Sequence, residues 1–473
     1  MKSAKDELLV AGVDSSTQSV KVVIRQAISG RFLRTGRADH PAGTEVDPEA
    51  WWHAIQIALE DAGGIDDVAG ISIGGQQHGM VALDEDGEVI RPALLWNDTR
   101  SAQEASDLNS EYQELHQDQS IALAVGSTLV ASFTASKVRW LAEHEPQKAS
   151  RLAAVALPHD WLTWKLSGSS SISDLFTDRS DASGTGYFDS VTSTYRRDIF
   201  ALALKDSREI TLPRVLAPFE IGGRTPSGVV LGAGCGDNAG AALGVGALPG
   251  DVVVSLGTSG TAFSVSKTST HDVEGYVAGF ADATGNYLPL VCTLNAARIL
   301  DAGSKILGMS LTEMGKRALA AKAGAEGITL LPYFEGERTP NRPKATGVFT
   351  GLNLSNSTSE NIARAMFEGM LCGLVEAVHY LEILDVEVKR ILIIGGAAKN
   401  PAIGPIASAL FGKPVYFPED SEYVANGATK QIATALLGYE PSWSNAEMRV
   451  VESKAELFIV ERYRTLVQQT STW

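Results

Sequence analysis

The fold is decided by residues 8–25, which read LLVAGVDSSTQSVKVVIR. Leu8–Asp14 and Val20–Arg25 are apolar runs of strand length, and the polar segment Ser15–Ser19 between them has the composition of a turn. The pattern predicts a β-hairpin. Hydroxyl and backbone N–H groups in such a tight turn form a concave donor surface that suits phosphate oxygens. A plain polar turn with an Asx-type hydrogen bond explains the same residues, so this motif alone leaves both interpretations open.

The segments after the hairpin alternate between strands and a helix. After a short turn, Arg31–Arg37 is predicted as a third strand. A helix then begins after Asp47, because an aspartate N-cap followed by Pro48 is a typical helix start. Val68–Ile73 is predicted as a buried strand. This alternation is typical of an α/β domain.

A similar opening recurs in the second half of the chain. Asp251–Leu256 and Thr261–Val265 are apolar runs on either side of a glycine-containing turn. Further on, Arg390–Ile394 is predicted as a strand and Pro401–Phe411 as a helix. The sequences of the two halves have negligible identity, so the repeat is one of architecture.

The length of the chain also indicates more than one domain. A chain of 473 residues exceeds what one hydrophobic core usually supports. We expect an N-terminal domain over residues 1–232 and a C-terminal domain over residues 233–473, with the boundary near Leu231–Gly236. The predicted fold class is α/β, with two domains of related topology.

The composition excludes several classes of partner. The net charge of −16 repels nucleic acid and anionic membranes, so neither is expected as a partner. No apolar stretch approaches the roughly 20 residues needed to cross a bilayer, and residues 1–7 do not resemble a secretory leader. The three cysteines are far apart and lack metal-ligand spacing, which favours reduced thiols. We expect a soluble cytoplasmic protein.

Asp237 is the first candidate for catalysis. It follows a glycine-containing turn and precedes a small-residue helix, Ala239–Leu248. One interpretation is that Asp237 is the N-cap of this helix. The other is that it is a general base, because phosphoryl transfer to an alcohol uses a carboxylate that accepts the hydroxyl proton. Both interpretations can hold together.

Two polar segments have the residue types that recognise a sugar. Gln76, Gln77 and His78 come directly after a buried strand, and Trp96 and Asp98 follow in the next polar segment. Polyols are bound by dense hydrogen-bonding groups beside an apolar floor. A lone histidine at a strand end is nevertheless more often structural than a ligand contact.

Two further turns suit a nucleotide. Gly257 and Thr258 lie between the two apolar runs of the second hairpin, where the glycine lets the backbone approach a ligand closely. Residues 395–400 read GGAAKN between a strand and a helix, which is typical of a nucleotide-binding edge and equally of an ordinary connection. In the first half, Asp14 at the end of its strand could hold Mg²⁺ through water.

Taken in order, these motifs resemble the FGGY carbohydrate kinases along essentially the whole chain. Residues 132–141 look like the first signature of the family, and residues 347–352 through 364–369 look like the second. Residues 332–340 match its inter-domain loop. The resemblance implies two actin-like (ribonuclease H-like) ATPase domains that flank a catalytic cleft, with the sugar mainly on the N-terminal domain and ATP mainly on the C-terminal one.

Within the family, the motifs around His78, Trp96 and Asp237 are most similar to those of the xylulokinases. This resemblance implies transfer of the γ-phosphoryl of MgATP to D-xylulose, with closure of the cleft excluding water. Asp237 would accept the proton, and Asp14 would be needed near the metal. The implied sugar contacts are Gln77, His78, Asp98, Trp96 and Asn238. The implied ATP contacts are Ser16, Thr17, Gly257, Thr258, Gly396, Ala397 and Asn400. A homodimer is one assembly compatible with this interpretation.

Because of Gln77, sugars other than D-xylulose remain alternatives as the phosphoryl acceptor. Xylulokinases commonly have Met at this position, so a ribulose, fuculose, gluconate or glycerol-like polyol kinase is an alternative. Cys235 replaces a usual glycine, which affects backbone freedom rather than chemistry. A non-catalytic sugar-responsive regulator on the same scaffold would lack the base or a phosphate turn, yet Asp14, Asp237 and Thr258 are all present. A Rossmann dehydrogenase is excluded, because no GxGxxG motif follows the first strand.

Overall fold

The opening hairpin is present in the computed structural model, which describes residues 8–443 and 447–471. Strand β1 (Leu9–Ser15) pairs antiparallel with β2 (Ser19–Gln26), and β2 pairs antiparallel with β3 (Phe32–Asp39). These strands agree with the sequence prediction to within a residue or two. β1 also pairs parallel with β5 (Gly70–Gly75), so the polar residues that follow β1 and β5 lie at the same edge of the sheet.

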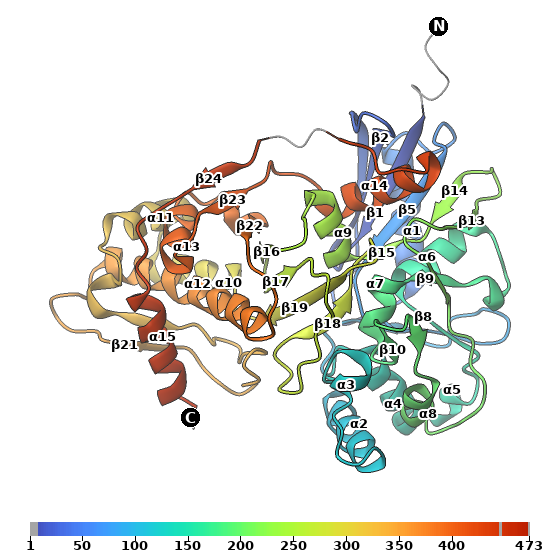
Figure 1. Ribbon diagram of the computed structural model, residues 1–473, viewed down its shortest axis with the longest axis horizontal. Coiled ribbons are helices and arrows are strands. Elements are labelled where there is room, and N and C mark those ends of the chain that lie inside the picture. Colours follow the sequence, from blue (N-terminus) through green and yellow to red (C-terminus); the bar gives the residue numbers. More distant parts are fainter. Residues whose placement is uncertain (1–7, 444–446, 472–473) are drawn as a thin grey trace, which may run out of the picture. The chain divides into compact units, whose positions relative to one another are not determined.

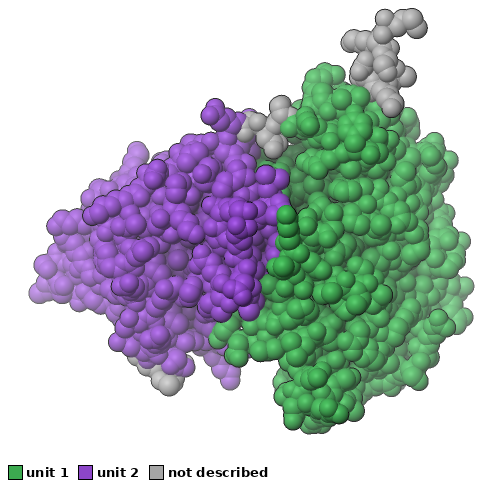
Figure 2. All heavy atoms as spheres, in the orientation of Figure 1, with its two compact units in different colours: residues 1–247, 267–288, 421–445 green, residues 248–266, 289–420, 446–473 purple. Residues whose placement is uncertain are grey.

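The chain divides into two compact units, coloured separately in Figure 2. Unit 1 comprises residues 1–247, 267–288 and 421–445, and unit 2 comprises residues 248–266, 289–420 and 446–473. The single boundary predicted between residues 232 and 233 therefore falls inside unit 1. The physical reason is that α14 (Tyr423–Leu437), from the end of the chain, packs on β1 and on α9 (Asp237–Val245).

The main sheet of unit 1 has the strand order β13-β14-β5-β1-β2-β3, and β15 also pairs with β5. Its remaining strands are β13 (Ile221–Arg224), β14 (Val230–Gly232) and β15 (Cys235–Gly236). The helices of the unit, besides α9 and α14, are α1 (Pro48–Asp61), α2 (Ala102–Leu115), α3 (Ala122–Val125), α4 (Thr134–His144), α5 (Pro146–Ala149), α6 (Pro158–Ser167), η2 (Ile172–Asp174), α7 (Arg179–Ala182), η3 (Ser183–Thr185) and α8 (Arg197–Leu204) (Figure 1). Its short strands are β4 (Glu45–Val46), β6 (Val81–Leu83), β7 (Ala93–Leu94), β8 (Ala154–Ala156), β9 (Phe176–Asp178), β10 (Phe188–Asp189), β11 (Thr194–Tyr195), β12 (Arg214–Leu216) and β18 (Ala278–Ala281).

Unit 2 repeats the strand arrangement. Its strands run in the order β19-β17-β16-β22-β23-β24, in which β16 pairs antiparallel with β17 and parallel with β22. They are β16 (Asp251–Leu256), β17 (Gly260–Ser264), β19 (Tyr287–Thr293), β22 (Arg390–Ile394), β23 (Val415–Phe417) and β24 (Arg449–Val451). The other elements are β20 (Thr329–Leu331), β21 (Val348–Thr350), α10 (Ala297–Leu307), α11 (Leu311–Ala320), η4 (Ala325–Gly327), α12 (Ser359–Ile383), η5 (Gly396–Lys399), α13 (Ile403–Phe411) and α15 (Phe458–Gln469). The predicted architectural repeat is confirmed.

Helix α1 begins where its capping signal predicts. The Asp47 side chain accepts a hydrogen bond from the Glu49 N–H, and Pro48 occupies the first turn. Trp51, Ile55 and Ala58 are buried on one face of the helix and belong to the apolar cluster of the unit 1 sheet. This helix therefore covers one face of the sheet with the residues that its periodicity indicates.

Glycines let α14 pack closely inside unit 1. A Cβ on Gly12 of β1 would lie 2.0 Å from the main-chain oxygen of Ala425, and one on Gly427 would lie 1.9 Å from that of Gly240 in α9. Backbone approach this close excludes any side chain at these positions. As a result β1, α9 and α14 form one packed group, from which Asp14 and Asp237 both extend.

The three cysteines are free and buried, as expected for reduced thiols. Among the helices of residues 8–443 and 447–471, none is both long and apolar enough to cross a membrane.

Candidate active site

The polar residues of unit 1 converge at the end of β5. Gly74 of β5 pairs with Asp14 of β1 on one side and with Cys235 of β15 on the other, both in parallel register. Asp14 and Asp237 are thus held on either side of the segment that continues from β5 into Gln77 and His78. The edge formed by the carboxyl ends of parallel strands is where ligands bind in α/β sheets.

Asp237 is the first residue of α9 and is not its N-cap. The N-cap position belongs to Gly236, so the N-cap interpretation is wrong. Instead, the Asp237 carboxylate accepts hydrogen bonds from the N–H of Asn238 at 2.7 Å and from its Nδ2 at 2.8 Å. Burial, together with the negative charge of Asp14, raises the pKa of Asp237 to about 7. A carboxylate with this pKa can accept a proton near neutral pH.

Asp14 is buried beside a cation that the sequence did not reveal. Its carboxylate accepts a hydrogen bond from Ser16 Oγ, and Lys21 Nζ lies 3.6 Å from Oδ2. Burial raises the pKa of Asp14, against the lowering effect of the Lys21 charge. Lys21 also donates to Glu422 Oε2 at 2.7 Å. No local pattern connects Glu422 with Lys21, since the two are joined only by the docking of α14.

Gln77 and His78 are both hydrogen-bonded to one short segment of the same unit. Gln77 Nε2 donates to the Ser180 main-chain oxygen at 3.2 Å, and His78 Nδ1 lies 2.5 Å from the Gly184 main-chain oxygen. The His78 ring packs near Phe133, with a centroid distance of 4.9 Å. His78 has a φ of 69°, a conformation that non-glycine residues seldom adopt. Such strained residues cluster at functional sites.

Trp96 and Asp98 are held by different partners. Trp96 Nε1 donates to Thr17 Oγ1 at 2.8 Å, which joins a predicted sugar contact to a predicted phosphate contact. Asp98 accepts hydrogen bonds from Arg100 Nε at 2.9 Å and from Thr44 Oγ1 at 2.8 Å. Burial would raise the pKa of Asp98, but the hydrogen bonds from Arg100 and Thr44 outweigh it and lower the pKa. Asp98 is therefore an ionised residue that orders its own loop.

Unit 2 contains a pocket of about 460 Å³ that brings together the predicted nucleotide contacts of this unit. Its lining comprises Leu256, Gly257, Thr258, Ala297, Leu300, Asp301, Leu311, Thr312, Gly396, Ala397, Lys399, Asn400 and Pro401. Asn400 is fixed in place, because its Nδ2 donates to the Leu311 main-chain oxygen at 2.9 Å and its Oδ1 accepts from the Ala402 N–H at 3.0 Å. The volume lies within the range of small-molecule pockets. The predicted phosphate contacts Ser16 and Thr17 belong to unit 1.

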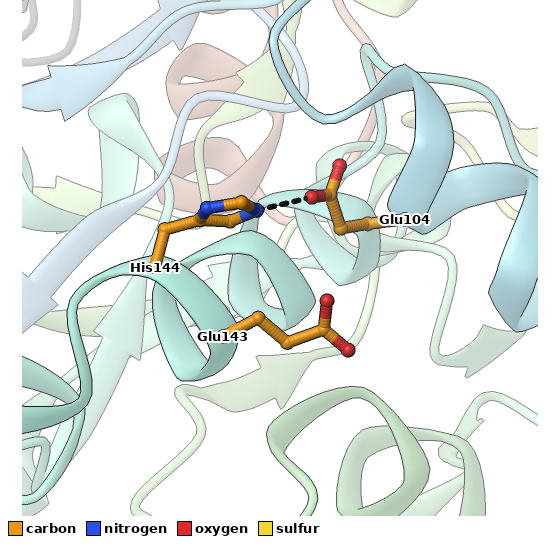
Figure 3. Close-up of side chains that lie close together, drawn as sticks. All are labelled: Glu104, Glu143 and His144. Carbon is orange, nitrogen blue, oxygen red and sulfur yellow. Dashed lines mark hydrogen bonds and ion pairs between the residues drawn. The ribbon is translucent and has the colours of Figure 1, made fainter.

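A separate group of potential metal ligands lies on α2 and α4 of unit 1 (Figure 3). His144 Nε2 is 2.7 Å from Glu104 Oε1. The third member, Glu143, already accepts hydrogen bonds from Arg139 Nε at 2.7 Å and Lys205 Nζ at 2.6 Å. Two cations therefore compensate the charge of Glu143, and the group is an ion-pair cluster rather than a cation site.

Comparison with known proteins gives a consistent result. Residues 9–244 match the N-terminal domain, and residues 252–436 the C-terminal domain, of the FGGY family of carbohydrate kinases. A xylulose kinase of Streptomyces coelicolor is 41% identical over 470 residues, which covers 95% of this chain and 94% of that protein. The crystal structure of a xylulose kinase from Bifidobacterium adolescentis superposes with a TM-score of 0.90 at 45% identity, covering 97% of this chain and 99% of that one. A gluconate kinase structure from Lactobacillus acidophilus shares the fold, with a TM-score of 0.84 at 21% identity, covering 98% of this chain and 96% of that one.

Proposed function

Because the chain belongs to the FGGY family of carbohydrate kinases, it is a phosphotransferase that phosphorylates an alcohol group of a sugar with ATP, and we propose that this sugar is D-xylulose. The observation that carries the proposal is the convergence of Gln77, His78 and Asp237 at the end of β5. The names of the relatives that are 41% and 45% identical support the same sugar.

In the proposed reaction, Asp237 is the general base. The primary hydroxyl oxygen of the sugar forms a bond to the γ-phosphorus, the bond from that phosphorus to the β-γ bridging oxygen breaks, and ADP leaves. The hydroxyl proton passes to Asp237. The two hydrogen bonds from Asn238 hold the carboxylate in one orientation, and its pKa of about 7 lets it accept this proton and release it again.

The sugar is proposed to contact Gln77 and His78, with Trp96, Asp98 and Asn238 around them. The contacts of Gln77 and His78 with main-chain oxygens of residues 180 and 184 support this assignment, because they orient both side chains before the sugar arrives. A glutamine amide can form up to four hydrogen bonds, so its bond to Ser180 is compatible with binding hydroxyl groups as well. Asp98 is already bonded to Arg100 and Thr44, so we assign it mainly to shaping the loop that carries Trp96.

Mg²⁺ enters with ATP as part of the substrate. The residues fit such an ion, because Asp14 supplies the hard oxygen donors that Mg²⁺ prefers, and the Asp14 charge contributes to the raised pKa of Asp237. Asp14 would hold the ion through water, with the Ser16 hydrogen bond orienting the carboxylate. When bound, Mg²⁺ neutralises charge on the phosphate oxygens. The nucleotide itself is assigned to the unit 2 pocket, with Gly257 and Thr258 toward the phosphates and Gly396, Ala397 and Asn400 toward the adenosine.

The test is a coupled ADP-release assay with D-xylulose, D-ribulose, L-fuculose, gluconate and glycerol. We expect D-xylulose to have the highest kcat/KM. Removal of a hydroxyl that the site hydrogen-bonds leaves a buried polar group unpaired, so discrimination of at least about tenfold is expected. Another acceptor that exceeds D-xylulose by that margin would overturn the sugar assignment, and the absence of turnover with every acceptor would favour a sugar-responsive regulator.

A further inference from the structure

His159 lies in unit 1 at the centre of a buried group of carboxylates that the proposed reaction does not use. Its Nε2 is 3.3 Å from Asp160 Oδ1, 3.6 Å from Asp178 Oδ1 and 3.2 Å from Asp181 Oδ2. These four side chains are between 0 and 4% exposed. His159 and Asp160 come from α6, Asp178 from the end of β9 and Asp181 from α7.

This arrangement favours a positive charge at its centre. Carboxylates buried together repel each other strongly unless a cation compensates them or one of them keeps its proton, and burial together with the neighbouring carboxylates raises the pKa of Asp181 well above its usual value. Asp178 is also committed to main-chain contacts, because it accepts hydrogen bonds from the N–H groups of Ser180 and Asp181 at 2.8 and 2.9 Å. By contrast, both oxygens of Asp181 lack a hydrogen-bond partner, and so do both ring nitrogens of His159.

The surroundings supply little other compensation. The negative charge of Asp237 is among those that raise the pKa of Asp181. Tyr187, which is buried, and Tyr195, which is half-buried, lie near the cluster and remain neutral, because burial and the negative charge of Asp160 raise the pKa of each phenol. Arg197 has only a weak influence on these phenols. Burial lowers the pKa of His159, but the charges of Asp160, Asp181 and Asp178 outweigh it and raise the pKa to about 9.

The carboxylates that surround His159 anchor a segment that holds the sugar site. We call residues 178–185, which comprise Asp178, α7 and η3, the platform. The platform accepts hydrogen bonds from the Gly236 N–H through Ser180 Oγ at 3.0 Å and from Gln77 Nε2 through the Ser180 main-chain oxygen at 3.2 Å. It also meets His78 through the Gly184 main-chain oxygen. The residue after Gly236 is Asp237, so the platform touches both proposed sugar contacts and the backbone just before the proposed base.

The His159 ring is fitted closely against the sheet on its other side. A Cβ on Gly234 would lie 2.5 Å from His159 Nδ1, and a Cβ on Gly75 would lie 2.8 Å from His159 Cβ. Gly75 is the last residue of β5, and Gly234 directly precedes β15. The ring is thus wedged between these strand ends and the platform, and movement of the platform would be transmitted to Gln77, His78 and Asp237.

We propose that His159 is a positioning residue whose positive charge, placed between Asp178 and Asp181, holds the platform against Gln77, His78 and the backbone before Asp237. We attribute the positioning of the platform to the positive charge of His159, and not to the shape of the imidazole ring or to a bound metal ion. This inference rests on the proposed placement of the sugar and the base in unit 1.

The test compares His159→Gln with His159→Lys. Glutamine removes the charge but keeps a polar side chain of similar length, whereas lysine keeps the charge and, being protonated, cannot ligate a metal. We expect His159→Gln to lose about tenfold to hundredfold in kcat/KM for the sugar, since a loosened site forfeits orientation, with little change in the KM for ATP. His159→Lys should recover most of that loss. Equal loss in both variants, or an equal rise in both KM values, would overturn the proposal.

A second measurement covers the case in which His159→Gln fails to fold. Asp181→Asn removes one of the carboxylates that the cation compensates, so the double variant His159→Gln with Asp181→Asn should be better folded and more active than His159→Gln alone. Additive losses would contradict the charge pairing. Elemental analysis of the purified wild-type protein should find no stoichiometric transition metal. A stoichiometric metal in the wild-type protein that is missing from His159→Gln would overturn the proposal in favour of a metal site.

The acceptor in all these assays is whichever sugar the wild-type protein uses best. A wrong sugar assignment therefore shows in the wild-type panel and leaves the comparison of variants intact. A wrong base assignment shows in the Asp237 variant described below, whereas failure of the His159 proposal shows only in the contrast between glutamine and lysine.

Discussion

Asn238 donates two hydrogen bonds to the same oxygen of Asp237, one from its main-chain N–H at 2.7 Å and one from Nδ2 at 2.8 Å. This pair fixes the carboxylate at the first turn of α9 without making it the N-cap of the helix, which is Gly236. Neither of these two bonds uses the second carboxylate oxygen, Oδ2, which would accept the proton in the proposed reaction. The amide oxygen of an asparagine at position 237 would accept the same two hydrogen bonds. The Asp237→Asn variant therefore keeps the shape of the side chain and removes only its ability to accept a proton.

Asp237→Asn should retain the two hydrogen bonds but cannot accept a proton. General-base catalysis is typically worth ~10²–10⁴-fold, so we expect kcat to fall by at least about two orders of magnitude while sugar binding changes little. Turnover and sugar affinity measured on the same preparation check this. A folded variant that keeps more than about a tenth of wild-type turnover would mean that the base lies elsewhere, with Asp14 the next candidate.

The stability of the protein should depend on the protonation of Asp237. Its pKa is raised from the usual 3.8 to about 7 by burial and the Asp14 charge, so the folded state binds this proton more tightly than the unfolded state. The resulting stabilisation is complete below the unfolded pKa and is lost as the pH rises through about 7. Thermal unfolding should therefore show that Asp237→Asn gains stability over wild type at about pH 8, and gains less at about pH 5. A gain that does not grow with pH would show that the folded pKa is not raised.

Catalysis should have the opposite pH dependence. The base must be ionised to accept the hydroxyl proton, so kcat/KM for the sugar should decline as the pH falls below about 7. This decline is measured as the acidic side of the pH profile of wild-type kcat/KM. A profile that stays flat down to about pH 5 would contradict Asp237 as a base with a raised pKa.

His78 needs two substitutions, because its backbone is unusual. Its φ of 69° is tolerated by asparagine better than by alanine. The loss of one buried polar contact to a hydroxyl costs roughly 1–3 kcal/mol, so both His78→Ala and His78→Asn should lower kcat/KM for the sugar by about tenfold to hundredfold with ATP affinity unchanged. His78→Ala should lower the Tm more than His78→Asn does. An equal fall in ATP affinity would remove His78 from the sugar site.

Two adjacent glycines in unit 2 form a matched pair. Gly395 has a φ of 97°, and a Cβ there would lie 2.8 Å from main-chain atoms of Leu256. A Cβ on Gly396 would meet no other atom within 4 Å, and the φ of Gly396 is not positive. Gly395→Ala should therefore lower the Tm and raise the KM for ATP, since Leu256 and residue 396 line the same pocket. Gly396→Ala should leave the Tm unchanged, and equal Tm losses in the two variants would contradict this backbone account.

Local sequence patterns determined the strands and the helix starts. The hairpin β1–β2, the strand β22 and the cap of α1 follow from hydrophobic runs, glycine turns and an Asp-Pro pair, all of which act over a few residues. The same locality placed Gln77, His78 and Thr258 just beyond strand ends, where ligands of α/β sheets bind. Cap assignment failed for Asp237 because the boundary between N-cap and first turn depends on one residue's backbone angles.

Only the tertiary structure decided which distant residues complete the site. Glu422 reaches Lys21 across 401 positions of sequence because α14 docks on β1. The cluster of His159 with Asp178 and Asp181 forms because α6 and α7 pack beside the strand ends. Hydrophobic periodicity specifies which face of an element is buried, but it does not specify which buried face meets which. Those encounters, and the charges they bring into contact, depend on the packing of the whole unit.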